Sequence, residues 1–454
     1  MPLSAIKEWL QTVGLKKAIS YLDSNPEKHI PQLINWIEMI DRKQVIAQQL
    51  SAVKSALENK SGNWYQLVKS LYTDIDVCVR KKIFENFLIY GNVIGGQKQR
   101  ENEGKYQCNI PWTILMDPTS SCNLECQGCW AADYGHKMSM NFETLNSIIE
   151  QGKVLGIFVY LFSGGEPLIR KDDIIRLCEK HQECTFLAFT NGTLIDEAFV
   201  HEMLRVKNFV PAISIEGFEI ETDARRGIGT YNAALTAMAL LKQNKLLFGI
   251  SCCYTSENTE VVGSEAFFDA MIDAGAKFAW FFTYIPVGIN AAVDLITSAA
   301  QREFMYRQIR QFRETKPIFT MDFWNDGEHS NGCIAGGRKY LHINANGDIE
   351  PCAFIHYSDS NIYEKTILEA CQSPLFMQYR QRQPFNENHL RPCPLLDNKY
   401  ILAEMVKSSE AKSTELKHPE DVHSLCEKCE QAADNWEPIA NRLWEENQPP
   451  KTAS

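Results

Sequence analysis

Short apolar runs alternate with longer amphipathic segments six times between Pro111 and Gly288. An apolar run of this length predicts a buried strand, and apolar positions three and four residues apart predict a helix. Strand then helix, repeated, is typical of a parallel sheet with crossover helices, and six units predict an α/β fold of the partial βα-barrel type. The predicted strands are 112–116, 158–162, 186–189, 210–215, 248–254 and 278–285, and helices include 142–154, 173–180 and 231–242.

The first 105 residues have a helical pattern without a strand signal. Residues 61–63 predict a break between helices, and the polar stretch 95–104 predicts a linker. The pattern favours a helical packing domain over a module for substrate or partner, and it leaves both open. Apolar positions with helical spacing in this part are Leu33, Ile37 and Ile40, and then Ile46, Leu50, Val53 and Leu57.

The last third of the chain carries a linking helix at 301–313 and a hairpin signal. Asn346 and Gly347 between two apolar runs are typical of a tight hairpin turn. Together with the pattern upstream, this predicts three parts: an α-helical N-terminal domain at 1–105, the partial barrel at 106–316, and a small cysteine-rich extension with C-terminal helices at 317–454.

Composition narrows the function classes. The chain has 454 residues and a net charge of -11, which argues against general affinity for nucleic acid because phosphate binding needs a basic face. Residues 1–16 lack a signal-peptide pattern and no apolar run reaches membrane-span length, so we expect a cytoplasmic protein without a membrane span. Fifteen cysteines, an uneven number, then favour metal ligation over a disulfide framework.

Three cysteines lie within eight residues directly after the first predicted strand: Cys122, Cys126 and Cys129. Thiolates are soft ligands that suit zinc, copper(I) or iron-sulfur clusters, and one short loop can direct all three at one centre. A structural metal site normally takes four protein ligands, so three thiols predict an open coordination position. The carboxyl ends of barrel strands are where active sites lie, which makes this loop the catalytic candidate.

Polar residues follow the next strands. Paired glycines allow close approach to the backbone, a carboxylate suits an ammonium group, and Arg suits a carboxylate. Each of these groups also fits a plain turn, a solvated strand end or a helix cap. The candidates are Gly164, Gly165, Glu166 and Pro167 after the second strand, Asn191 after the third, Ser214 and Glu216 at the fourth, and Arg226 beyond it.

A second group of cysteines comes late in the chain. The predicted hairpin brings Cys333 near Cys352, Cys393 follows between two prolines, and Cys426 with Cys429 forms a CX2C pair. Such a pair suits zinc as well as an iron-sulfur cluster. The remaining cysteines stand in periodic segments, where buried free thiols are the better interpretation: Cys78, Cys108, Cys178, Cys184, Cys252, Cys253 and Cys371.

The CX3CX2C loop, followed one strand later by Gly-Gly-Glu-Pro, resembles the radical S-adenosylmethionine (SAM) superfamily. The resemblance implies a 4Fe-4S cluster on Cys122, Cys126 and Cys129 whose open iron holds SAM by its amino and carboxylate groups. It implies reductive cleavage of SAM to a 5′-deoxyadenosyl radical, which takes a hydrogen atom from substrate.

Roles for the strand-end residues follow from the same resemblance. The element from Gly164 to Pro167 would hold the methionine amino group, Asn191 the rim, Ser214 and Glu216 the ribose side, and Arg226 the carboxylate; residues 284–288 resemble the element on the adenine side. The chain departs from the family in one place. Family loops commonly carry an aromatic residue before the third cysteine, whereas here this residue is Gly128 and the aromatic is Trp130, so adenine stacking is expected to be rearranged.

Cys333, Gly347 and Cys352 resemble the auxiliary-cluster extension called the SPASM or shorter twitch domain, although the full SPASM cysteine set is not present. The resemblance implies one auxiliary 4Fe-4S cluster on Cys333, Cys352, Cys393 and either Cys426 or Cys429, with zinc as the alternative metal.

The predicted function is therefore radical SAM chemistry, as oxidoreductase or transferase, giving oxidation, crosslinking or carbon-carbon or carbon-sulfur bond formation on a peptide or protein. A lipid or small metabolite is the alternative substrate, and a non-enzymatic zinc-stabilised scaffold is the alternative of another class. The expected partners are the substrate and a low-potential electron donor such as flavodoxin or ferredoxin.

Overall fold

The computed structural model describes residues 58–134, 138–288 and 291–447, together with Lys17, Tyr21 and His29. Its centre is a nine-stranded sheet with the order β7-β6-β5-β4-β3-β2-β1-β8-β9. The six predicted strands are all present and run parallel in chain order, which confirms the partial βα barrel. They are β1 (Thr113–Met116), β2 (Val159–Phe162), β3 (Thr185–Thr190), β4 (Phe209–Ser214), β5 (Gly249–Tyr254) and β6 (Phe278–Thr283).

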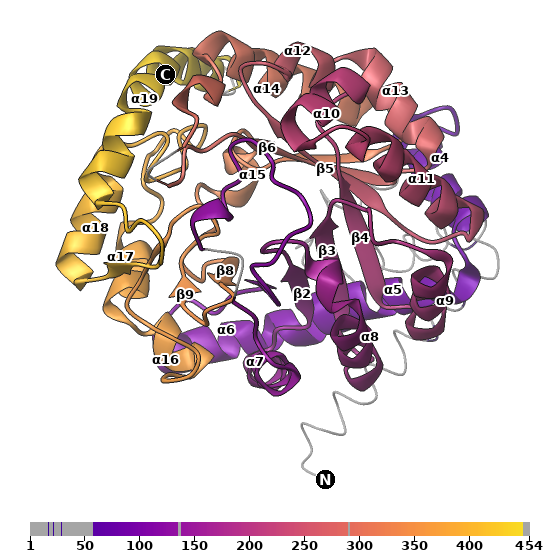
Figure 1. Cartoon of the computed structure of the whole chain (residues 1–454), viewed down its shortest axis with the longest axis horizontal. Helices are drawn as coiled ribbons and strands as arrows, with labels where there is room; N and C mark the ends of the chain where they lie inside the picture. The colour runs from indigo at the N-terminus through magenta and orange to yellow at the C-terminus, as the bar shows by residue number, and fades with distance from the viewer. Residues whose placement is uncertain are drawn as a thin grey trace, which may run out of the picture.

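Helices cover the outer face of this sheet, as Figure 1 shows. Their apolar sides pack on the strands in one large core, because the parallel strands are buried on both faces and need cover. A second apolar cluster lies inside the curve of the sheet and continues into the C-terminal part. The outer helices are α7 (Phe142–Leu155), α8 (Lys171–Lys180), α9 (Glu197–Val206), α10 (Glu219–Arg226), α11 (Thr230–Gln243), α12 (Thr259–Val262), α13 (Glu265–Ala274) and α14 (Ala299–Thr315).

The sheet extends beyond the predicted strands at both edges. At one edge β7 (Phe319–Asp322) pairs in parallel with β6. At the other, β8 (Tyr340–Ile343) pairs in parallel with β1 and forms an antiparallel hairpin with β9 (Ile349–Glu350). The predicted hairpin is thus present, and its first strand is also part of the barrel wall. The segment that leads to Cys352 therefore lies beside the strand that leads to the three-cysteine loop.

The described N-terminal part is helical: α4 (Asn63–Asp74), α5 (Val77–Phe84), the π-helix η1 (Glu85–Ile94) and α6 (Gly95–Tyr106). The predicted break at 61–63 precedes α4, but the predicted polar linker at 95–104 is wrong because α6 occupies it. Tertiary packing explains the helix: a Cβ on Gly95 would lie 2.5 Å from the Gly156 carbonyl oxygen, and Gln99 donates to that same oxygen. Helices expected around Leu33, Ile37, Ile40, Ile46, Leu50, Val53 and Leu57 lie outside the described residues.

The C-terminal part packs along one side of the barrel (Figure 1). Its largest element, α19 (Val422–Glu446), contacts α14, and a buried ion pair between Arg302 and Asp397 joins α14 to the segment before α18. The smaller elements are α15 (Gly327–Ser330), β10 (Tyr357–Ser358), α16 (Ile367–Cys371), α17 (Pro374–Arg382), α18 (Ile401–Ser409) and β11 (Lys412–Ser413).

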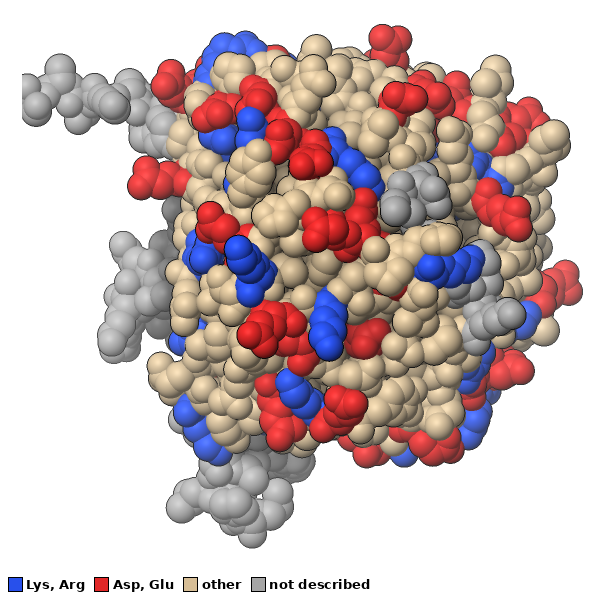
Figure 2. Space-filling model, turned by 60° about the vertical axis from the view of Figure 1, so that its left-hand side comes forward, with Lys and Arg blue, Asp and Glu red and all other residues tan. Residues whose placement is uncertain are grey.

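Two surface properties bear on function. None of the helices in the described ranges combines the length and apolar character that a membrane span needs. On the face drawn in Figure 2, acidic and basic side chains are interspersed among uncharged residues, a pattern unlike the single-sign surface that binds nucleic acid.

Candidate active site

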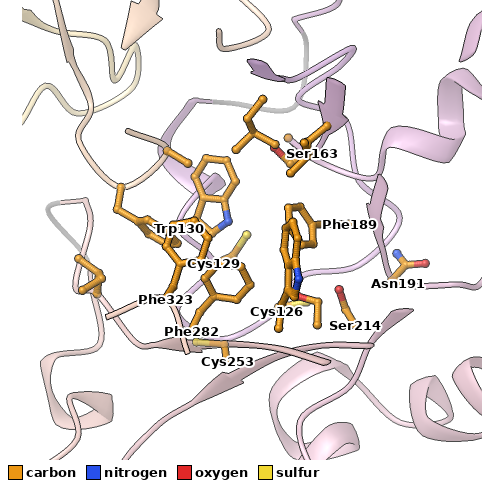
Figure 3. A pocket seen from close by; sticks show the side chains of 18 of the residues that line it. Cys126, Cys129, Trp130, Ser163, Phe189, Asn191, Ser214, Cys253, Phe282 and Phe323 are labelled. Carbon is orange, nitrogen blue, oxygen red and sulfur yellow. The ribbon is translucent and has the colours of Figure 1, made fainter. Parts of the chain in front are cut away.

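A cavity of about 330 Å³ lies inside the curve of the sheet. The three-cysteine loop, the carboxyl ends of the strands and the segment around β8 line it, and Figure 3 shows Cys126, Cys129, Ser214 and Cys253 at its wall. Because parallel strands end at the same edge of a sheet, side chains far apart in sequence meet here.

The three-cysteine loop is pinned at this edge. The Gln127 N–H donates to the Arg225 carbonyl, which fixes the loop to the end of α10. Cys122, Cys126 and Cys129 all line the cavity. Burial raises the pKa of Cys122 to about 11 and also raises that of Cys129, so these two thiols stay protonated at neutral pH without a metal. The structure brings the three predicted ligands together on one wall.

The paired glycines hold this loop in place. A Cβ on Gly165 would lie 2.0 Å from the Ser121 carbonyl oxygen, and one on Gly164, whose φ is +101°, would lie 2.5 Å from the Thr119 carbonyl oxygen. The N–H groups of Gly165 and Glu166 donate to the same two carbonyls. The glycines line the cavity, as expected, but the backbone that leads into the cysteine loop occupies the space where their side chains would be.

We expect Gly165→Ala to destabilise the protein by about 3 kcal/mol, because the clash is with backbone that cannot move aside. The cysteine loop should be displaced, so iron bound after reconstitution should fall as well. Gly104→Ala is the control: no atom lies within 4 Å of its Cβ position in α6, and alanine should cost nothing there. Urea unfolding and iron content measure both; equal stabilities would contradict the assigned packing.

Glu166 is buried after β2, with its carboxylate at the cavity wall. It accepts hydrogen bonds from the Leu168 N–H at 2.9 Å, the Thr190 hydroxyl at 2.6 Å and the Asn191 N–H at 2.8 Å. Burial raises its pKa, while these bonds oppose the rise. An ionised carboxylate has about four acceptor positions, so one remains for a ligand cation. Pro167 begins the short helix η3 (Pro167–Arg170) and is not part of the cavity lining.

Asn191, directly after β3, and Ser214, the last residue of β4, line the same wall (Figure 3). The Asn191 side-chain amide donates to the Asn123 side chain at 2.9 Å. Asn191 therefore connects the end of β3 to the cysteine loop as well as facing the cavity.

Glu216 lies behind the wall rather than in it. Its fully buried carboxylate accepts hydrogen bonds from Arg225 at 2.6 Å, from Arg226 Nε at 2.8 Å and from the Cys253 N–H at 3.0 Å. Burial would lower the pKa of Arg226, but Glu216 raises it, so the guanidinium stays charged. Both guanidinium groups line the cavity, and Arg226 Nη1 is 4.0 Å from Cys126 Sγ. Glu216, predicted to face the ribose, instead positions two cations.

The loop has glycine instead of an aromatic residue at position 128, but an aromatic ring from another segment contacts it there. Gly128 has φ +64°, and a Cβ there would lie 2.7 Å from the ring of Tyr284, which follows β6 and lines the cavity. Trp130 faces the C-terminal part, with its ring centroid 5.5 Å from His342 and 5.9 Å from Phe354. The sequence showed that Gly128 departs from the family pattern, but it did not identify Tyr284 as the ring beside this glycine.

A buried charged network joins the loop region to the β8–β9 hairpin. His342 Nε2 is 3.0 Å from Asp117, directly after β1, and its Nδ1 is 2.6 Å from Glu350. Burial would lower the pKa of His342, but the two carboxylates raise it to about 10, so the ring is an imidazolium. The Tyr134 hydroxyl, five residues beyond Cys129, also donates to Glu350. Nothing in the sequence pattern pointed to this network, because its members are far apart in the chain.

The five late cysteines gather in the second apolar cluster. Burial raises the pKa of Cys352 to about 12 and the pKa values of Cys393 and Cys426 to about 11, and Cys393 is close enough to raise the pKa of the other four thiols. Cys426 and Cys429 are both buried on α19. Neighbours of two of these cysteines line the cavity: Ile334, Tyr340, Ala353 and Phe354. The cavity therefore borders both thiol groups.

The stability of the metal-free protein should depend on these buried thiols. The ordinary thiol pKa is 9.0, and burial raises that of Cys393 and Cys426 to about 11. The unfolded chain then releases protons first, so stability is full below pH 9 and is lost as pH rises toward 11. We expect the free energy of unfolding to fall by about 1.4 kcal/mol per pH unit for each such thiol. Urea titrations of the reduced apoprotein measure this, and Cys393→Ser should give a shallower slope; identical slopes would contradict the prediction.

Two of the cysteines interpreted as buried free thiols are not fully buried. Cys78 is exposed on α5, and Cys253 is partly buried and lines the cavity beside Arg225. Alternation along a strand explains the second case: Cys252 packs under the outer helices, so Cys253 faces the barrel interior. The period-two pattern of β5 contained that signal. Cys108, Cys178, Cys184, Cys252 and Cys371 are buried as predicted.

Family models match two parts of the chain. Residues 116–260, which contain the three-cysteine loop and the Gly-Gly-Glu-Pro turn, match the radical SAM superfamily. These residues therefore form a radical SAM domain. Residues 333–394, which contain Cys333, Cys352 and Cys393, match the SPASM family, an iron-sulfur cluster-binding domain. The chain thus has an iron-sulfur domain where zinc was the alternative.

Curated relatives of the chain include enzymes. It is 24% identical over 228 residues to the Fe-coproporphyrin III synthase of Methanosarcina barkeri, covering 48% of this chain and 57% of that protein. It is 24% identical over 259 residues to the PqqA peptide cyclase of Granulibacter bethesdensis, covering 53% and 67%. Among solved structures, Streptococcus suis SuiB bound to its precursor peptide SuiA shares the fold, with TM-score 0.55 and 19% identity over 74% of this chain and 81% of SuiB.

The side chains at the cysteine-loop wall fit a 4Fe-4S cluster and SAM, which radical SAM domains bind. Three thiols from one loop leave one iron of a 4Fe-4S cluster open, and a buried carboxylate and a guanidinium stand beside it for the charged ends of an amino acid. In the described part of the chain, no three His, Cys, Asp or Glu side chains are arranged to hold a single metal ion.

Proposed function

We propose that the protein reductively cleaves SAM and uses the resulting radical to modify a peptide by oxidation, crosslinking or carbon-carbon or carbon-sulfur bond formation. The single observation that carries the proposal is a cavity with the three-thiol loop, Glu166 and Arg226 at one wall and the neighbours of Cys333 and Cys352 at another. Such a cavity holds a reacting group between a radical source and an electron acceptor.

The cluster and SAM, when bound, supply a 5′-deoxyadenosyl radical that takes a hydrogen atom from substrate. Cys122, Cys126 and Cys129 would bind the cluster as thiolates. Glu166 would accept the methionine ammonium group at its remaining acceptor position, and Arg226 would donate to the carboxylate. Tyr284 would lie against the adenine, with Asn191 and Ser214 on the ribose side.

The chain's further contribution is to keep water away from the reacting atoms. Most of the cavity wall is aromatic or aliphatic, as the rings of Trp130, Phe189, Phe282 and Phe323 in Figure 3 illustrate. An apolar wall offers few donors and acceptors to water, so a carbon radical formed there meets its intended partner first.

Cys333, Cys352 and Cys393 would hold the auxiliary 4Fe-4S cluster, with either Cys426 or Cys429 as fourth ligand. Their place on the far side of the cavity suits acceptance of an electron from the substrate radical. The Tyr340 hydroxyl, 2.6 Å from Cys352 Sγ, would stabilise the thiolate and so favour the bound state.

A peptide is the substrate class that the comparisons support. One curated relative is named a PqqA peptide cyclase, and SuiB has been solved with a precursor peptide bound. We further propose the domain ranges 1–105, 106–316 and 317–454, a cytoplasmic location, and a low-potential electron donor of the flavodoxin or ferredoxin type.

Anaerobic reconstitution tests the function. Protein loaded with iron and sulfide should turn brown and, with dithionite and SAM, should form 5′-deoxyadenosine, measured by liquid chromatography. Colourless protein that retains zinc and forms no 5′-deoxyadenosine would favour the non-enzymatic scaffold and contradict the proposed function.

A further inference from the structure

The cavity has two chemically different parts. Its polar groups belong to the cysteine loop and to the strand ends, whereas most of the remaining wall is built of aromatic rings. These rings contact one another: Phe189 and Trp280 have centroids 5.0 Å apart, as do Phe282 and Phe323. We call this wall the aromatic part of the cavity; it consists of Trp112, Phe189, Trp280, Phe282, Phe323 and Phe354.

The inward rings of the aromatic part are incompletely buried. Along β6 the burial alternates: Phe281 packs fully under the outer helices, while Trp280 and Phe282 keep accessible surface inside the cavity. Apolar surface exposed to water is unfavourable by about 25 cal/mol per Å², so a ligand that covers these rings gains their burial. Rings in such an arrangement pack well with another ring, edge to face or offset.

One cation stands at the opposite end of this part from the cysteine loop. Lys339 lines the cavity, and its carbonyl accepts hydrogen bonds from the N–H groups of Trp112 and Thr113 at the start of β1, whereas the loop follows the end of β1. The Lys339 side chain is exposed, and in the described ranges it forms no ion pair with an acidic side chain. An unpaired ammonium group at the edge of an apolar cavity suits a ligand anion.

We propose that the aromatic part binds one aromatic side chain of the substrate peptide and that Lys339 binds a carboxylate near that side chain. The inference rests on the proposed function only in taking the occupant to be the reacting part of a peptide. The cavity also has to hold SAM at the cysteine loop, so the space left at the aromatic part suits a single ring system rather than a macrocycle. The peptide main chain stays outside, because the rings offer its N–H and C=O groups no partners.

Indole-3-propionate is a suitable probe because it combines one ring system with one carboxylate, and its methyl ester is the uncharged match. Equilibrium dialysis against the cluster-loaded holoenzyme with SAM should show tighter binding of the acid. Lys339→Met should weaken acid binding about tenfold and leave the ester unchanged, while Lys339→Arg should retain both. Lys407→Met, an exposed lysine on α18, is the control.

A matched pair of variants tests the aromatic part of the cavity. Phe323→Leu should weaken both acid and ester about tenfold, whereas Phe319→Leu, on the same segment but outside the cavity lining, should weaken neither. Equal binding of acid and ester by the wild type, or equal effects of the two Phe variants, would overturn the proposal. Decanoate that binds more tightly than indole-3-propionate and depends on Phe323 would instead assign the site to an aliphatic chain.

The same preparations separate this inference from the proposed function. Absence of 5′-deoxyadenosine together with binding that depends on Lys339 and Phe323 would overturn the function and leave the ligand class standing. If SAM is cleaved but binding of the probes depends on neither Lys339 nor Phe323, the proposed ligand class alone would be overturned.

Discussion

Cys126→Ala should abolish formation of 5′-deoxyadenosine, a loss of at least about a thousandfold. Cys126 is the middle thiol of the loop, its sulfur lies 4.0 Å from Arg226 Nη1, and the loop supplies only three ligands. Removing one leaves too few thiolates to hold a cluster at this wall. Iron content of the reconstituted protein and chromatography of the reaction with dithionite and SAM measure the effect.

Cys352→Ala should have the opposite pattern: 5′-deoxyadenosine still forms, but the modified product does not. Cys352 belongs to the other thiol group, across the cavity from the loop. Cys78→Ala is the control, because Cys78 is exposed on α5 and belongs to neither group. Equal loss of SAM cleavage in the Cys126 and Cys352 variants would contradict the division of labour between the two groups.

The barrel was predictable because its signal is local. Each strand is a buried apolar run followed by a helix with its own apolar stripe, so all six core strands could be read from periodicity. Strand β7 was missed, and β8 was predicted as a hairpin strand but not as part of the barrel wall, because its parallel partner β1 lies more than two hundred residues earlier in the chain. The helix α6 was missed because Gly95 and Gly96 suggested a linker, whereas close packing against Gly156 favours glycine there.

The site was predictable to the extent that its residues follow strand ends. The loop cysteines, Glu166, Asn191 and Ser214 meet at the cavity wall because the topology places all strand ends at one edge. Which of these side chains reach the cavity, and which stay behind its wall, could not be predicted. Glu216 and Arg226 both follow β4, yet only the arginine reaches the cavity, since the carboxylate is held behind it by two guanidinium groups.

The charged network around His342 joins the two segments that carry the thiol groups. Asp117 precedes the cysteine loop and Glu350 precedes Cys352, and one buried imidazolium pairs with both. Separating the loop from the hairpin would leave uncompensated charges in the interior, which is strongly unfavourable. The network therefore resists any change in the spacing of the two groups.

Glu216→Ala should destabilise the protein by about 3–5 kcal/mol, because it leaves the buried guanidinium groups of Arg225 and Arg226 without their shared carboxylate. Without that anchor the two cations are free to move toward solvent, so the affinity for SAM should fall together with stability. Urea unfolding measures the first effect and equilibrium dialysis of SAM against the cluster-loaded protein measures the second.

Glu219→Ala is the matched control, since Glu219 is an exposed acidic residue at the start of α10 and should change stability by no more than about 0.5 kcal/mol. The more informative comparison is with Arg226→Gln. If Arg226 binds the SAM carboxylate and Glu216 acts only through it, the double variant should bind SAM no more weakly than Arg226→Gln alone. Additive losses would instead mean that Glu216 acts on SAM by a second route, either through Arg225, which it also anchors, or by direct contact, which its position behind the wall argues against.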